Sequence, residues 1–337
     1  MRTGSGLRWT SSGRDDVMRR AVSVSLDRVF AGDRVAVARA ISAIENESEG
    51  AAELLRQIFS RTGRGYRIGI TGPPGAGKST ITNRLAQHYR KEGRSVGIIA
   101  VDPTSPFTGG ALLGDRVRMT DVELDEGVFI RSMASRGSLG GLSKKAVEAA
   151  DVLDASGKDI VILETVGVGQ SELDIAGAAD TTVVVLVPES GDSIQAMKAG
   201  LMEIGDFFVL NKSDRAGADQ AAMSLTMILH FRQAADGWAP DVLKAVASEG
   251  TGTTEIVAMI ADHRRFLEQG GGLQQRRRRR LEERVRELVA DRLRVDFWSE
   301  ERQRLLSSRI GSVEAHQSTP YELAGELIED FRTRELE

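Results

Sequence analysis

GITGPPGAGKST, residues 69–80, is the stretch of the chain that decides its fold. An apolar run, YRIGIT, leads into it and an amphipathic segment follows, which predicts a strand, a tight turn and a helix. Gly72, Gly77, Lys78 and Ser79 fit the spacing G-x-x-x-x-G-K-[ST] in that strand-to-helix context. Glycines let backbone N–H groups approach a phosphate, and the start of a helix adds partial positive charge. The stretch therefore predicts a phosphate-binding loop.

The loop predicts the binding of a nucleoside triphosphate together with Mg²⁺. Lys78 would reach the β- and γ-phosphates, and the Ser79 hydroxyl would ligate the metal ion. A glycine-rich turn that merely joins a strand to a helix is the alternative, and the complete eight-residue pattern in this setting argues against it. The residues predicted to contact the nucleotide here are Gly72, Pro73, Pro74, Gly75, Ala76, Gly77, Lys78, Ser79 and Thr80.

Short apolar runs alternate with helical stretches from residue 65 to residue 267. Runs such as VVVLV and IVIL are apolar throughout, which is typical of strands covered on both faces. The alternation predicts an α/β fold of the P-loop NTPase type, with a doubly wound, mostly parallel sheet. Helical extensions flank it at residues 20–64 and, as a C-terminal arm, at residues 268–337, whose last helix begins at the capping pattern Thr319, Pro320 and Glu322. Residues 1–19 are expected to form a disordered tail.

The composition excludes several classes of function. The 337-residue chain is 41% hydrophobic and 28% charged, and its net charge of −4 argues against general affinity for nucleic acid. It has no cysteine and four scattered histidines, so thiolate chemistry is excluded and a structural metal site is not expected. No apolar run is long enough to cross a bilayer and no secretory signal begins the sequence, so we expect a cytoplasmic protein without membrane contact. Five arginines at 276–280 could meet an anionic surface, but acids on the same predicted helix favour a solvated or subunit-facing segment.

A second motif, NKSD at residues 211–214, follows a predicted buried strand and indicates the base. Asp214 can accept hydrogen bonds from N1–H and the 2-amino group of guanine, donors that adenine lacks. Each bond to a charged group contributes about 1.5–3 kcal/mol, so losing two disfavours ATP by at least about a hundredfold. Lys212 would lie along the base, and Asn211 would tie this turn to the phosphate loop. After the next strand, the backbone N–H groups of VASEGTG are placed to close over the base, from Ala247, Ser248 and Glu249.

Three carboxylates are candidates for the Mg²⁺ site beside Ser79. Asp102 and Glu164 end predicted strands and Asp115 follows in a long loop, so all three lie at or near the carboxyl edge of the sheet. Because Mg²⁺ retains several water ligands, some of these contacts would be indirect. The alternative is that one or more of these carboxylates caps a helix or a turn.

The residues after Glu164 predict a moving element. The segment ETVG occupies the place of the D-x-x-G switch of GTPases, so the N–H of Gly167 would sense the γ-phosphate. Gln170 could orient the attacking water, and its position suits a solvated loop residue equally well. No arginine finger can be assigned by spacing, so hydrolysis is expected to be slow, on the order of 10⁻⁴ to 10⁻² per second. Such a rate is that of a timer.

Taken together, these motifs resemble the MeaB/ArgK family, the methylmalonyl-CoA mutase-associated GTPases. The resemblance spans residues 20–335 and is carried by GPPGAGKST, VDPTSPFTGGALLGDRVRM, RSMASRGSLGGLS, ETVGVGQSE, GDSIQAMKAGLMEIGDFFVLNKSD and VASEGTG. Pro73 and Ala76 depart from the valines that are more usual in the family's loop, and they leave its glycine, lysine and serine framework intact.

The resemblance implies a chaperone that binds GTP or GDP with Mg²⁺ and forms a homodimer through its C-terminal helices. It would gate the delivery of adenosylcobalamin to an acyl-CoA mutase and would protect or reactivate that enzyme. The resemblance also implies an additional switch in GDSIQAMKAG, with Gln195 and Lys198 as signalling residues. Without the resemblance, Lys198 would be interpreted as a solvent-facing lysine.

Two other functions stay open on the sequence. A P-loop phosphotransferase or ATPase, the older description of some family members in amino-acid transport, would need an acceptor pocket that no spacing here identifies. A metal-insertion GTPase would favour His- or Cys-rich stretches, which the chain lacks.

Asp214→Asn tests the assignment of the base. An amide cannot accept from both guanine donors as a carboxylate does, so the preference for GTP over ATP should fall while the phosphate loop still binds. Calorimetric titration with each nucleotide measures this preference, and unchanged affinities for both would contradict the assignment.

Overall fold

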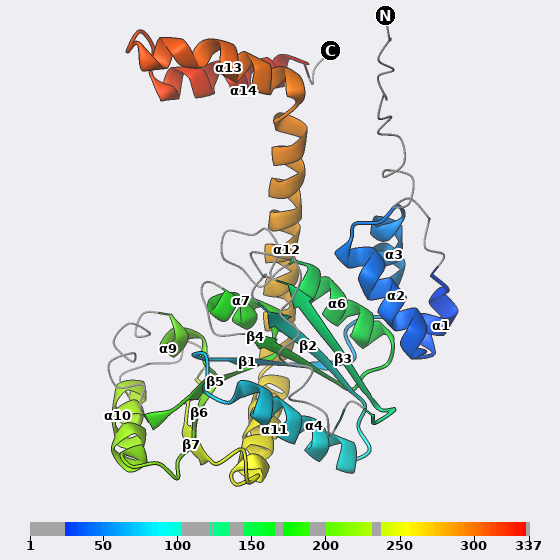
Figure 1. Ribbon diagram of the computed structural model, residues 1–337, viewed down its shortest axis with the longest axis vertical. Helices are drawn as coiled ribbons and strands as arrows, with labels where there is room; N and C mark the ends of the chain where they lie inside the picture. The colour runs from blue at the N-terminus through cyan, green and yellow to red at the C-terminus, as the bar shows by residue number, and fades with distance from the viewer. Residues whose placement is uncertain are drawn as a thin grey trace, which may run out of the picture. The chain divides into compact units, whose positions relative to one another are not determined.

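A computed structural model describes residues 24–102, 122, 124–134, 144–165, 171–188, 200–230 and 237–334. Within these residues, seven strands form one parallel sheet in the order β3-β2-β4-β1-β5-β6-β7 (Figure 1). The strands are β1 (Tyr66–Thr71), β2 (Val96–Asp102), β3 (Val128–Ala134), β4 (Ile160–Thr165), β5 (Thr181–Leu186), β6 (Phe207–Asn211) and β7 (Val242–Ala245). All seven match the predicted apolar runs. The strand that leads into residues 69–80 lies at the centre of the sheet.

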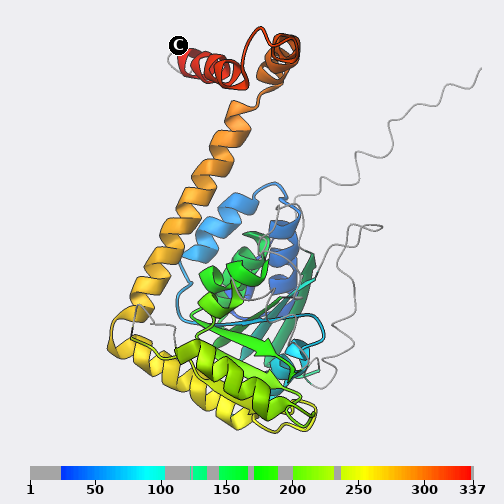
Figure 2. The ribbon, with the colours of Figure 1, turned by 90° about the vertical axis from the view of Figure 1, so that its left-hand side faces the viewer.

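Helices cover both faces of the sheet (Figures 1 and 2). On one face lie α4 (Lys78–Lys91) and α11 (Thr253–Gln269), and on the other lie α6 (Lys144–Ala155), α7 (Ser171–Ala178), α9 (Leu201–Ile204) and α10 (Ala218–His230). Because side chains alternate along a strand, Ile162 of β4 packs in the α4 layer while Val161 and Leu163 pack in the α6 layer. The doubly wound α/β fold predicted from the sequence is confirmed.

Three N-terminal helices extend the α6 layer: α1 (Leu26–Phe30), α2 (Arg34–Glu45) and α3 (Ala51–Phe59). Residues 26–45, which lie in the predicted N-terminal helical extension, form the first two of these helices. Asp33 starts the second helix, because its carboxylate accepts a hydrogen bond from the N–H of Ala36 at 2.8 Å. Val29, Val37 and Ile41 are buried in the same cluster as α6, so these helices share the core of the sheet.

A buried charged cluster fixes the start of β1, at the edge opposite the phosphate loop. The Asp154 carboxylate accepts hydrogen bonds from the N–H groups of Gly63, Arg64 and Gly65 at 2.7, 3.1 and 2.8 Å. Arg67 lies 2.6 Å from Asp151 and 3.7 Å from Asp154, and all three side chains are buried. These contacts join α6 to the turn that feeds the central strand.

The chain divides into two compact units, Met1–Leu273 and Gln274–Glu337. The second contains most of α12 (Gly272–Phe297), with α13 (Glu300–Glu314) and α14 (Pro320–Arg334), which lie side by side (Figure 2). Arg302 holds the three together: it is buried, donates to the carbonyl of Asp296 at 2.8 Å, and lies 4.7 Å from the Phe331 ring centroid. No helix in the described part of the chain is both long and apolar enough to span a bilayer.

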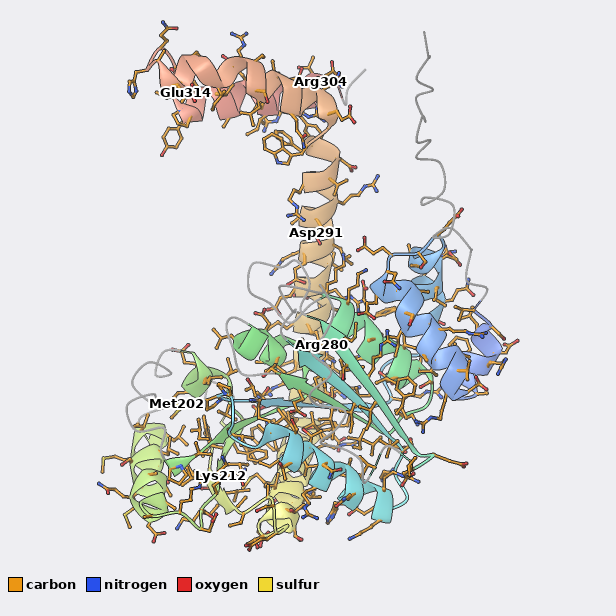
Figure 3. The ribbon with its side chains drawn as sticks, viewed as in Figure 1. Met202, Lys212, Arg280, Asp291, Arg304 and Glu314 are labelled. Atoms are coloured by element: carbon orange, nitrogen blue, oxygen red, sulfur yellow. The ribbon has the colours of Figure 1, made fainter. Side chains whose placement is uncertain are left out.

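Two predicted details of this second unit are confirmed. At the start of α14, Glu322 N donates to Thr319 Oγ1 at 3.2 Å and Thr319 N donates to the Glu322 carboxylate at 2.8 Å, which is a capping box. The hydrogen bond from the Thr319 backbone lowers the pKa of the Glu322 carboxyl. Within the arginine run, Arg278 pairs with Glu282 on the same helix at 3.0 Å. Figure 3 labels Arg280 and Asp291 along this helix.

Asp154→Ala is expected to destabilise the first unit strongly. It removes the acceptor of three backbone N–H groups and one anionic neighbour of buried Arg67, so the free energy of unfolding should fall by about 3–5 kcal/mol. Urea unfolding measures the change. Asp262→Ala is the matched control, because Asp262 is half-exposed and, among the residues that the structure describes, pairs with Arg265 of the same helix, and it should cost less than about 1 kcal/mol. Equal effects of the two substitutions would contradict the role of the cluster.

Candidate nucleotide-binding site

The carboxyl ends of β1, β4, β6 and β7 bring the predicted site residues to one edge of the sheet. In the strand register, Ile70 pairs with Glu164, and Asn211 pairs with Ala245. The phosphate loop follows β1 directly, and residues 247–249 follow β7. Segments that are far apart in the sequence therefore meet where open α/β sheets bind ligands.

The phosphate loop depends on two glycines that no other residue could replace. Gly72 has φ of +132°, and a Cβ there would lie 2.0 Å from the carbonyl oxygen of Val185 on β5. Gly77 has φ of +90°, and a Cβ there would lie 2.3 Å from the Asn211 amide nitrogen. Both positions combine a left-handed backbone with a close approach, so a side chain at position 72 would meet the backbone of β5 and one at position 77 would displace the Asn211 amide.

Lys78 is the first residue of α4 and its ammonium lies inside the loop. Nζ donates to the carbonyl oxygens of Gly72 at 2.8 Å and Pro73 at 2.9 Å, and the side chain is buried. A buried ammonium needs hydrogen-bond acceptors, which these carbonyls supply. Of the loop residues, Pro74, Gly75 and Thr80 are exposed, so the surface of the cradle is open to a ligand.

Ser79 and Glu164 meet beside this loop. The Ser79 hydroxyl donates to the Glu164 carboxylate at 2.5 Å, and both residues are buried. Asp102 ends β2, the strand next to β4, where Val101 pairs with Thr165. A hydroxyl and a carboxylate are the hard oxygen donors that Mg²⁺ prefers, so Ser79 and Glu164 fit a magnesium site at the head of α4.

Asn211 joins the phosphate loop to the loop after β7. Its amide nitrogen donates to the carbonyl of Ala76 at 2.8 Å, and its amide oxygen accepts from the N–H of Ala247 at 3.0 Å. The residue is buried, and backbone groups satisfy both the donor and the acceptor of its side-chain amide, as a buried polar group requires. The connection expected between NKSD and the phosphate loop is therefore present as a hydrogen bond.

The rest of the NKSD turn, residues 212–214, follows the carboxyl end of β6. Lys212, labelled in Figure 3, has φ of +57°, which is uncommon for a residue with a side chain, and its ammonium donates to the carbonyl of Gly75 at 2.9 Å. Ser213 N and its hydroxyl both donate to the carbonyl of Ala245, at 3.0 and 3.1 Å. Asp214 is exposed, so its carboxylate is accessible to a ligand.

One residue of this site is indicated by no sequence pattern. Arg84, six residues after the start of α4, donates to the backbone carbonyls of Ala247 at 3.0 Å and Ser248 at 2.6 Å. An arginine on an amphipathic helix is ordinarily solvated, and its acceptors are about half the chain away, so no local pattern marks it.

Several predicted residues lie outside the described part of the chain. They are Asp115, Gly167, Gln170, Gln195 and Lys198, and for Asp102 only the backbone is described. The expected roles of these residues in metal binding and switching remain predictions.

The sequence matches a known family over most of its length. Residues 37–302 match the family described as "Methylmalonyl Co-A mutase-associated GTPase MeaB". A Pyrococcus abyssi protein named as a GTPase is 52% identical over 268 residues, which cover 79% of this chain and 83% of that protein. The GTPase ArgK of Escherichia coli K12 is 40% identical over 258 residues, which cover 74% of this chain and 78% of ArgK.

A mouse protein and a solved structure are also similar to this chain. The mouse protein named "Methylmalonic aciduria type A homolog, mitochondrial" is 34% identical over 265 residues, which cover 73% of this chain and 64% of that protein. Among solved structures, a crystal structure titled as LAO/AO transport system kinase is 31% identical, with a TM-score of 0.71, and the alignment covers 91% of this chain and 96% of that one.

Proposed function

Because the chain belongs to the MeaB family of methylmalonyl-CoA mutase-associated GTPases, and is thus a GTPase, we propose that its nucleotide state controls its action on an adenosylcobalamin-dependent acyl-CoA mutase. In this role it would gate cofactor loading and would protect or reactivate the mutase. The proposal is carried by one observation: the Asn211 amide bonds both the phosphate loop and the loop after β7, so the two ends of a bound GTP would meet a single connected frame.

At the phosphate end, each described residue has a part that follows from its position. Backbone N–H groups of residues 72–77 and the start of α4 would hold the phosphates. The Lys78 ammonium would exchange its carbonyl acceptors for phosphate oxygens, which carry more negative charge. Ser79 and Glu164 would hold Mg²⁺, with Asp102 and Asp115 as further candidates. A bound Mg²⁺ neutralises charge on the β- and γ-phosphate oxygens.

At the base end, Asp214 would accept from guanine and residues 247–249 would lie over the ring. Exposure of Asp214, Ser248 and Glu249 supports these roles. The switch would begin where β4 ends at Thr165, next to buried Glu164, and would continue through Gly167 and Gln170. A second switch, with Gln195 and Lys198, would carry the nucleotide state to the mutase.

The proposal predicts nucleotide-dependent binding to a mutase. The chain should release free phosphate from γ-labelled GTP slowly, and a cobalamin-dependent acyl-CoA mutase should be retained by it to different extents with GTP and GDP. Lys78→Ala should abolish nucleotide binding or turnover and remove that difference. Mutase binding that ignores the nucleotide would contradict the proposal. A labelled acceptor in place of free phosphate would favour the phosphotransferase alternative.

We also propose that the C-terminal unit forms a homodimer. An apolar stripe along α12 is solvent-exposed, with exposed fractions of 41–58% for Leu281, Val285, Leu288, Val289 and Leu293. When a second helix covers apolar side chains at this spacing, the burial stabilises the associated state by roughly 25 cal/mol per Å² of apolar surface.

Light scattering tests the dimer directly. At micromolar concentration the mass should be about twice the chain mass of 36.5 kDa, and Val285→Glu, which puts a charge in the stripe, should shift it toward the monomer. Arg294→Glu is the control and should stay dimeric, because Arg294 is strongly exposed and lies on the opposite face of the same helix. A wild-type chain that runs as a monomer would remove the proposal.

A further inference from the structure

Arg84 makes a two-pronged contact with the loop that follows β7. Its Nε donates to the carbonyl oxygen of Ala247 at 3.0 Å, and one terminal nitrogen donates to that of Ser248 at 2.6 Å. The other terminal nitrogen lies 3.4 Å from the side-chain oxygen of Gln87 on the same helix. The rigid fork of a guanidinium suits two adjacent acceptors, which a flexible ammonium would hold less well.

Arg84 and Asn211 both contact the backbone of Ala247. The N–H of Ala247 donates to the side-chain oxygen of Asn211 at 3.0 Å, and its carbonyl oxygen accepts from Arg84. Ala247 and its contact with Asn211 are buried, and its contact with Arg84 is partly buried. Since a trans peptide carries its C=O and N–H on opposite sides, a carbonyl of Ala247 that faces Arg84 turns the N–H of Ser248 the other way. Ser248 itself is exposed.

The two contacts reach this loop from different parts of the phosphate cradle. Asn211 links it to Ala76 within the phosphate loop, and Arg84 links it to α4, the helix that begins with Lys78 and Ser79. Arg84 is six residues beyond Lys78, or about 9 Å along the helix axis. The helix that would hold the phosphates and metal ion therefore also holds the loop expected over the base.

We propose that Arg84 is a positioning residue for base recognition, which orients the backbone N–H of Ser248 toward the carbonyl oxygen O6 of a bound guanine, while the N–H of Glu249 donates to the carbonyl of Val246 at 3.0 Å. The inference rests on the guanine-binding role proposed for this site. It separates two determinants: Asp214 reads the N1–H and 2-amino side of the ring, and the loop held by Arg84 reads O6. Guanine and hypoxanthine carry O6, and 2-aminopurine does not.

The test compares three nucleoside diphosphates with Arg84→Ala by calorimetry in the presence of Mg²⁺. GDP and IDP, which both carry O6, should bind about ten- to a hundredfold more weakly than to the wild-type chain. The diphosphate of 2-aminopurine riboside should keep its wild-type affinity within about twofold, because it lacks the group that the loop would contact. Arg84→Lys should lose several-fold for GDP and IDP, and it decides the matter if Arg84→Ala does not fold.

Arg90→Ala is the matched control, because it removes an arginine from the same helix. Arg90 bonds the Asp125 carboxylate at 2.9 Å and the carbonyl of Arg94 at 2.8 Å, away from the cradle, so all three affinities should stay unchanged. Equal losses for all three nucleotides in the Arg84 variants, or no loss, would overturn the inference and leave the proposed function standing. A wild-type chain that binds no GDP would overturn both.

Discussion

The carboxyl ends of seven parallel strands lie at one edge of the sheet, and that constraint assembles the whole site. Each segment expected to touch the nucleotide or Mg²⁺ in the described chain leaves β1, β2, β4, β6 or β7 at this edge. Because β1 is central and buried along its whole length, the start of the phosphate loop is anchored in the core of the sheet. The segments that follow β6 and β7 are therefore positioned beside an anchored phosphate loop.

Hydrogen bonds then join the two ends of the site. The buried amide of Asn211 couples Ala76 to Ala247, and Arg84 couples Ala247 to α4. A ligand that moved either end would strain the same small set of contacts. A protein whose nucleotide state is read elsewhere needs such a connection, because independent base and phosphate sites would respond separately.

Most of this architecture could be predicted, since the decisive patterns are local. Residues 69–80 contain a full loop signature, and the apolar runs of the strands are short and bounded by turns. Asn211 could be linked to the loop because NKSD follows a buried strand. Arg84 could not be found, because its carbonyl acceptors lie 163 and 164 residues away and carbonyls are present on every residue.

The buried charged cluster of Arg67, Asp151 and Asp154, at the edge opposite the phosphate loop, also determines which substitutions the turn before β1 can accept. Asp154 holds the turn before β1 through main-chain N–H groups alone, at residues 63–65. Any amino acid except proline offers that group, so replacing the exposed side chain of Arg64 would keep this hydrogen bond, whereas replacing the Asp154 carboxylate would remove all three. A proline at position 64 would remove one of the three N–H donors that anchor the start of the central strand.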